Sequence, residues 1–204
     1  RLNYPVESSP MATARPQMFR IFAALGAAAC IGTMASAANA GPLHVTSPAP
    51  LPLDNHMPRV FMGGSIDMGG APDWQAAMTR ALSDMDVVIL NPRRPDWNPA
   101  WRPEADEPEF RRQVEWELAA LEASDVIVMY FAPGTQSPIS LLEMGLHARS
   151  GKLIVLAPDG FWRKGNVDIT AEAYGVRQVS NMEELTAAVR EALSEAAAEG
   201  RFNR

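Results

Sequence analysis

The chain has 204 residues, of which 47% are hydrophobic and 21% charged, values typical of one globular domain with an added tail. Its formal net charge of −6 argues against nucleic acid as the main partner, because binding a phosphate backbone usually needs a basic face. A single cysteine excludes an intrachain disulfide, and no Cys/His ligand spacing occurs. We therefore expect no metal site. Nothing in the sequence implies an organic cofactor either.

The first 40 residues contain the pattern of a secretory signal peptide. Arg20 supplies a basic start, residues 21–32 are apolar and rich in alanine, and Ala38-Asn39-Ala40 matches a cleavage site. The apolar stretch is too short and too rich in small residues for a stable membrane span. This pattern predicts export to the periplasm with cleavage after Ala40. The alternative is a cytoplasmic protein whose translation starts at Met57.

Residues 41–57 are rich in proline and are expected to form an extended linker, which leaves residues 58–204 as a single domain. Within this domain, short apolar segments alternate with helical patterns. We expect strands at 59–62, 87–90, 126–131, 153–156 and 176–179, helices at 73–85, 109–124, 138–150 and 182–198, and long loops at 91–108 and 158–166. Strands that are apolar throughout and alternate with helices predict a parallel sheet covered on both faces. About five such strands favour an α/β fold of the flavodoxin-like (Rossmann-like), doubly wound kind.

The most informative carboxylate belongs to the helix expected after the strand at 126–131. Ser137 is a good N-cap and Pro138 a good first residue, so the helix start is well defined. Glu143 lies about a turn and a half inside, and at about 100° per residue we expect it on the side of three apolar residues, Ile139, Leu142 and Leu146. Carboxylates are rare on apolar faces unless they are paired or used, so Glu143 is a candidate nucleophile beyond the end of a parallel strand.

A second carboxylate, Glu117, projects between Phe110, Val114 and Leu121 on the helix expected at 109–124. Two interpretations are open. Glu117 is either buried with a partner such as an arginine, or turned toward a cavity.

The loops that follow the strands carry groups suited to a nucleoside. Aromatic rings suit stacking on a flat base, a Gly-Gly-Ser turn allows close backbone approach, and arginines suit a 5′-phosphate. The alternative is that the tryptophans pack the loops onto the domain and the arginines are solvated. The candidates for substrate binding are Gly64, Ser65, Asp67, Trp74, Arg93, Arg94, Trp97, Gln136, Ser137 and Trp162.

Segments 63–66, 91–97, 137–145 and 160–167 resemble the nucleoside 2-deoxyribosyltransferase-like family, and the likeness extends over about residues 58–170. The resemblance implies that Glu143 is the nucleophile, that Glu117 binds the sugar where typical members have aspartate, and that the protein is a homo-oligomer. The turn at 133–137 lacks the acidic residue that contacts the base in typical members. Gln136 or Asp67 would then substitute for it.

The leading hypothesis is transfer of a 2-deoxyribosyl group between nucleobases through a covalent glycosyl-enzyme on Glu143. The alternatives are an N-glycoside hydrolase acting on nucleosides or nucleotides, and a non-catalytic nucleotide-binding sensor. The expected partners are a small-molecule nucleoside or nucleotide and a free base.

Overall fold

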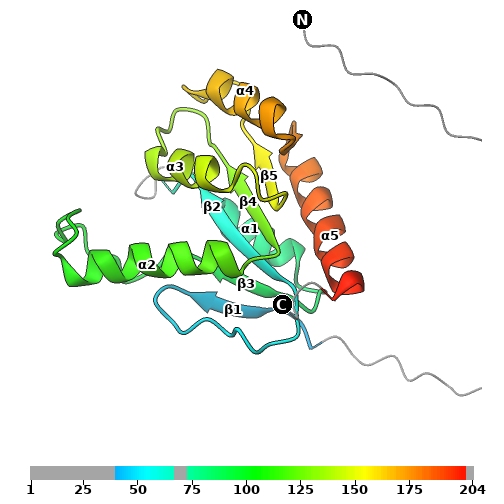
Figure 1. Ribbon diagram of the computed structural model, residues 1–204, viewed down its shortest axis with the longest axis horizontal. Helices are drawn as coiled ribbons and strands as arrows, with labels where there is room; N and C mark the ends of the chain where they lie inside the picture. Colours follow the sequence, from blue (N-terminus) through cyan, green and yellow to red (C-terminus); the bar gives the residue numbers. More distant parts are fainter. Residues whose placement is uncertain (1–39, 67–72, 201–204) are drawn as a thin grey trace, which may run out of the picture. The chain divides into compact units, whose positions relative to one another are not determined.

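One sheet of six parallel strands, in the order β1-β3-β2-β4-β5-β6, organises the protein (Figure 1). The computed structural model describes residues 40–66 and 73–200. The strands are β1 (Leu43–Thr46), β2 (Arg59–Gly64), β3 (Val88–Asn91), β4 (Val126–Tyr130), β5 (Leu153–Leu156) and β6 (Arg177–Val179). From β2 to β6 the order is that of a flavodoxin-like sheet, as the sequence predicts.

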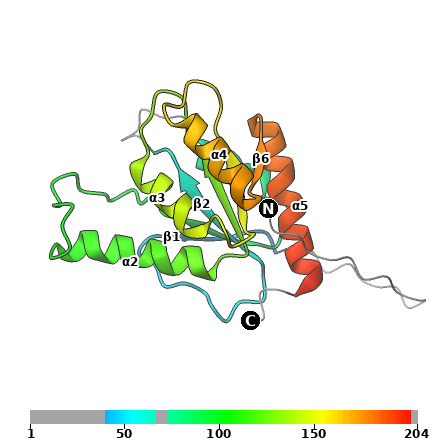
Figure 2. The same ribbon diagram turned by 45° about the horizontal axis from the view of Figure 1, so that its top comes forward.

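Five helices cover the two faces of this sheet. They are α1 (Trp74–Ala81), α2 (Pro108–Ala123), α3 (Pro138–His147), α4 (Lys164–Tyr174) and α5 (Met182–Glu199). Buried side chains of α2, α3 and α4 pack together on one face, and those of α1 and α5 share a separate core on the other. Figure 2 shows α2, α3 and α4 side by side in front of the sheet. None of the helices in the described ranges is long and apolar enough to cross a membrane.

The strand order has a topological switch point where β2 and β4 end. These strands are neighbours, yet the helix that follows β2 packs on one face and the helix that follows β4 packs on the other. In doubly wound sheets, ligands bind at such a topological switch point. Gly64 lies opposite Tyr130 at this point with φ +129°, and a Cβ there would lie 2.3 Å from the Tyr130 carbonyl oxygen. Only glycine fits the end of β2.

Two elements differ from the sequence prediction. Residues 41–57 are not only a linker, because Leu43–Thr46 forms β1 and pairs along β3, giving six strands rather than five. The helix α4 was not predicted, and it begins inside the loop expected at 158–166. Both patterns are weak, since β1 has four residues near prolines and α4 buries only Val167 and Ala171. The signal-peptide pattern before Ala40 and the candidate Asp67 lie outside the described residues.

Candidate active site

Glu143 lies on the buried side of α3. It is 7% exposed and shares that side with Ser140, Met144 and His147. Ser140 joins this part of α3 to the sheet, because its hydroxyl donates to the Gly64 carbonyl at 3.0 Å. The expected burial of Glu143 is therefore confirmed, and it places the carboxyl group beside the end of β2.

The neighbours expected for Glu143 on α3 were wrong. Ile139, Leu142 and Leu146 are 58%, 60% and 59% exposed, so they form an outer apolar stripe rather than the face that carries Glu143. Residues 140, 143, 144 and 147 repeat at the same helical spacing. The helix buries this less apolar stripe. Periodicity found both stripes but could not decide which of them faces the sheet.

The surroundings of Glu143 favour its protonated form. Burial and, secondarily, the negative charge of Glu117 raise the pKa of Glu143 to about 8. Within residues 40–66 and 73–200, no side chain donates a hydrogen bond to this carboxyl group and no cation pairs with it. A carboxyl group whose charge is uncompensated can react as a nucleophile once it has lost its proton.

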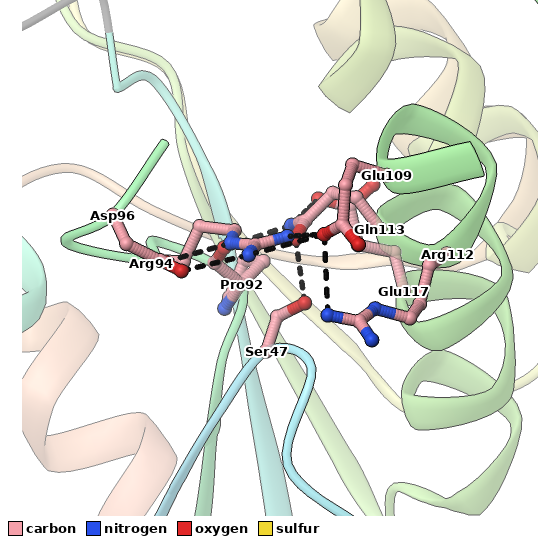
Figure 3. Close-up of polar contacts among 8 residues, drawn as sticks. All are labelled: Ser47, Pro92, Arg94, Asp96, Glu109, Arg112, Gln113 and Glu117. Atoms are coloured by element: carbon pink, nitrogen blue, oxygen red, sulfur yellow. Dashed lines mark hydrogen bonds and ion pairs between the residues drawn. The ribbon is translucent and has the colours of Figure 1, made fainter. Parts of the chain in front are cut away.

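Glu117 is the second carboxyl group of the site, and it comes from α2. Its partner is the amide of Gln113, which donates to Oε1 of Glu117 at 2.8 Å (Figure 3). An amide thus fills the place for which the sequence suggested an arginine. Burial raises the pKa of Glu117, and the hydrogen bond from Gln113 opposes that rise. The charge of Glu117 acts on Glu143, and their chain neighbours Trp116 and Met144 pack in the same core, so α2 and α3 bring the two carboxyl groups to one region.

Three hydroxyl groups meet at the end of β2 and in the turn before α3. The Oγ of Ser65 lies 2.7 Å from Oγ1 of Thr135 and 2.7 Å from Oγ of Ser137, and it accepts the N–H of Ala132 at 2.8 Å. Thr135 donates to the Ala132 carbonyl at 2.8 Å, so in its bond with Ser65 it is the acceptor. Ser137 also lies 3.1 Å from Oγ1 of Thr135, so the hydrogens of Ser65 and Ser137 are shared among the contacts of this three-hydroxyl cluster.

Ser137 precedes α3 as predicted, but it does not act as a capping side chain. Its backbone is left-handed, with φ 44° and ψ 51°, and its hydroxyl makes no capping hydrogen bond. Among the non-glycine residues that the structure describes, Ser137 alone has a positive φ. Strain of this kind costs about 1–3 kcal/mol and tends to be kept at functional sites.

Of the tryptophans suggested for stacking, Trp162 presents the most exposed ring. It is 52% exposed, and its N–H donates to the Gln136 carbonyl at 2.9 Å. Trp74 is 3% exposed, and its N–H donates to the Ser65 carbonyl. Trp97 packs edge-to-face against Trp101 at 5.2 Å between ring centroids. Trp74 therefore packs its loop onto the domain, Trp97 packs within its own loop, and the side chain of Gln136 is exposed.

Both candidate phosphate-binding arginines already face carboxylates. Arg94 is 6% exposed, and its guanidinium bonds Asp96 at 2.8 Å and Glu109 at 3.4 Å (Figure 3). Arg93 lies 3.2 Å from Asp73. Arg94 therefore has no free face for bidentate binding of a 5′-phosphate, whereas the side chain of Arg93 is 28% exposed.

Sequence reasoning missed Gln113, Thr135 and Ser140. Gln113 and Ser140 stand four and three residues before the two glutamates, and this helical spacing alone could have indicated them. Thr135 lies in a turn without periodicity, where no such signal exists. Within the described ranges, no group of three or more His, Cys, Asp or Glu side chains is arranged to hold a metal ion.

The family follows from a comparison with family models. The model described as nucleoside 2-deoxyribosyltransferase like matches residues 57–161, half of the chain. The protein belongs to the nucleoside 2-deoxyribosyltransferase-like family. The matched range of this family contains Gly64, Ser65, Glu117 and Glu143, but it begins after β1 and ends before α4.

A solved structure agrees on the fold of this family member. It is the crystal structure of a conserved protein from Enterococcus faecalis V583, with a TM-score of 0.50 and 14% sequence identity. The match covers 66% of this chain and 98% of that one. At this identity the likeness shows the architecture alone. A comparison with curated proteins gave no match.

Proposed function

We propose that the protein transfers a 2-deoxyribosyl group between nucleobases, with Glu143 as the nucleophile. The observation that carries the proposal is the position of Glu143: it is 7% exposed, on the side of α3 that Ser140 joins to the end of β2, and within the electrostatic influence of a second, partly buried carboxyl group. The family match is consistent with transferase-like chemistry. A carboxylate in such a place can form and release an ester with an anomeric carbon.

The proposed reaction has two displacements. An oxygen of ionised Glu143 bonds to the anomeric carbon as the glycosidic C–N bond breaks, and the base leaves with that electron pair and takes up a proton. A second base then attacks the same carbon through a ring nitrogen and loses its proton, while the ester C–O bond breaks and the carboxylate is restored. Two inversions give net retention.

The other groups of the site stabilise this reaction. Its transition state resembles an oxocarbenium ion, so the negative charge of Glu117 lowers its energy. The partly exposed hydroxyl of Ser137, supported by the buried Ser65, is placed to bind the sugar, and the exposed ring of Trp162 is the group best placed to stack on a base.

Product analysis tests the proposal. The purified protein is incubated with deoxyinosine or thymidine, with and without free adenine, and the products are separated by chromatography. We expect a new deoxynucleoside that appears only with adenine. Glu143→Gln should lower the rate at least about 1,000-fold, and Glu183→Gln, an exposed glutamate on α5, should leave it unchanged. Free base without exchange would replace transfer by hydrolysis, and saturable binding without products would indicate a sensor.

We also propose that the protein is exported through the signal-peptide pattern before Gly41. Mass spectrometry of the natively expressed protein should then find Gly41 at the N-terminus. A mature chain that begins at Met57 would contradict export.

A further inference from the structure

The amide of Gln113 links the edge of the sheet to Glu117. Gln113 lies on α2 and is 5% exposed. Its Nε2 lies 2.9 Å from the Pro92 carbonyl oxygen and 2.8 Å from Oε1 of Glu117, and its Oε1 lies 2.5 Å from the hydroxyl of Ser47 (Figure 3). Both polar atoms of this buried side chain thus form hydrogen bonds. The partners are a residue that follows β1, a residue that follows β3, and Glu117 on α2 itself.

The chemistry of these partners allows only one orientation of the amide. The Pro92 carbonyl can only accept, so the NH2 group must face it. One of its two hydrogens goes to Pro92 and the other to Glu117, and Ser47 must donate to the amide oxygen. Rotating the amide by 180° would place its oxygen against the Pro92 carbonyl and the Glu117 carboxylate and lose both of those bonds, whereas the Ser47 hydroxyl can accept from the amide as well as donate to it. The Pro92 carbonyl therefore sets the direction from which Glu117 receives its hydrogen bond, and Ser47 completes the hydrogen bonding of the amide.

Ser47 is itself held by the fold. It is 3% exposed, it directly follows β1, and its backbone N–H donates to the Asn91 carbonyl at 3.2 Å. The segment that carries it lies before the residues matched by the family model. A strand at the edge of the sheet, away from the switch point, thereby fixes a group next to the candidate site.

No cation in the described part of the chain competes with Gln113 for Glu117. The charged side chains around it pair with one another, since Arg94 bonds Asp96 and Glu109 and Arg112 bonds Glu109 (Figure 3). The negative charge of Glu117 in turn raises the pKa of Glu143 on α3. The amide of Gln113 is thus the group that offsets the burial of a charge on Glu117.

We propose that Gln113, oriented by the Pro92 carbonyl and supported by Ser47, is a positioning residue that holds the carboxylate of Glu117 beside Glu143 and favours its ionised form. This inference rests on the proposed function, in which the charge of Glu117 stabilises the transition state. A purely structural role, joining α2 to β1 and β3, would require the amide for stability but not for the ionisation of Glu117.

A carboxyl ¹³C NMR titration of the full chain separates the two roles. With ¹³C-labelled glutamate, and with Glu117→Gln to assign the signal, the pKa of Glu117 is measured in the wild type and in four variants. We expect Gln113→Leu to raise it by about one unit, a tenfold change in the ionisation constant, because a donor to the charged form is lost. Ser47→Ala should raise it less, and Ser47→Thr should restore it. Gln178→Leu is the matched control, because Gln178 also donates to a carboxylate, that of Asp168, but on the exposed β6.

An unchanged pKa of Glu117 in both Gln113→Leu and Ser47→Ala would overturn the proposal. If Gln113→Leu does not fold, the pKa of Glu117 in Ser47→Ala and Ser47→Thr tests the proposal by itself. Turnover is a separate measurement, in which Gln113→Leu should lower kcat at least about tenfold. If the pKa moves while the wild type turns over no deoxynucleoside, the proposed function fails and the positioning role stands.

Discussion

At the scale of single residues, the acidity of Glu143 makes a kinetic prediction. Burial and the charge of Glu117 raise its pKa to about 8, so at pH 7 only a minority of free protein carries the ionised nucleophile. We therefore expect kcat/KM to rise with pH and to level off above about pH 8, because kcat/KM reports ionisations of the free enzyme. Steady-state kinetics between pH 5.5 and 9.5 measures this.

The variant Glu117→Gln tests whether the charge of Glu117 shapes this pH dependence of kcat/KM. Removing the negative charge of Glu117 should move the inflection to lower pH while it reduces the plateau. A profile that is flat across neutral pH would show that the ionisation of Glu143 does not limit the reaction.

Glu143 also affects the free energy of unfolding, and its effect on the pH dependence is opposite to that of most carboxylates. Its pKa is about 8 in the folded protein and 4.5 when unperturbed, so between these values the unfolded chain releases a proton that the folded chain keeps. The free energy of unfolding therefore falls as pH rises from about 4.5 to 8. We expect Glu143→Gln to be more stable than the wild type by about 2 kcal/mol or more at pH 8.5 and nearly equal to it at pH 4.5. Urea unfolding at both pH values tests this, and an equal difference at both would contradict it.

At the scale of elements, the end of β2 gives a prediction about one glycine. Gly64 has φ +129°, and an added Cβ would lie 2.3 Å from the Tyr130 carbonyl oxygen and 2.7 Å from the Tyr130 nitrogen. Gly64→Ala therefore has to separate β2 from β4 at the switch point, and we expect it to cost about 3 kcal/mol or more of stability. Gly145→Ala is the control, since nothing lies within 4 Å of a Cβ there. Equal melting temperatures of the two variants would contradict this account.

The helix α3 shows what local sequence can and cannot determine about the site. Pro138 marked its first residue, because the preference of proline for the first helical turn is a local property, although Ser137 makes no capping hydrogen bond. The side of α3 that is buried is set by the whole sheet, and the helix buries Glu143 while it exposes Leu142. Likewise, the partner of Glu117 could not be read from a pattern, because the amide of Gln113 is oriented by the Pro92 carbonyl, 21 residues away. Tertiary contacts decide these points.

At the scale of the whole molecule, alternating apolar strands and helices predicted the doubly wound sheet from β2 to β6. The elements that the sequence did not predict, β1 and α4, are those that bury few side chains or only one side. In β1, Leu43 and His44 are exposed while Val45 is buried, which is too short a pattern to separate from a linker. The helix α4 contains Gly165 and has few apolar positions. Such elements are stabilised by the sheet on which they pack.

The helical face formed by α2, α3 and α4 predicts self-association. Ile139, Leu142 and Leu146 are 58–60% exposed on α3, and Ile169 on α4 is 69% exposed. A groove between α3 and α4, lined in part by Leu141 and Trp162, continues this apolar surface. We propose that a second copy of the chain covers it, because exposed apolar surface of this extent is unfavourable in a monomer.

Light scattering after gel filtration tests this proposal. We expect a dimer or larger assembly at micromolar concentration and a monomer for the double variant Ile139→Glu, Leu142→Glu. Leu53→Glu is the matched control, because Leu53 is also 61% exposed but lies before β2. A monomeric wild type would show that this face has another partner or none.

The strand β1 makes the residues before β2 part of the folded molecule. It pairs with β3 over four residues, and just after it Ser47 bonds Gln113 and the Ala49 carbonyl accepts the N–H of Trp116 at 2.7 Å. A chain that begins at Met57 lacks these bonds and exposes the edge of β3. It also leaves the amide oxygen of Gln113 without the hydrogen bond from Ser47. We expect the 57–204 chain to be less stable than the 41–204 chain by about 3 kcal/mol or more in urea unfolding. Equal stability would mean that β1 contributes nothing to the fold, and that Ser47 has no means of holding Gln113 and Glu117 in place.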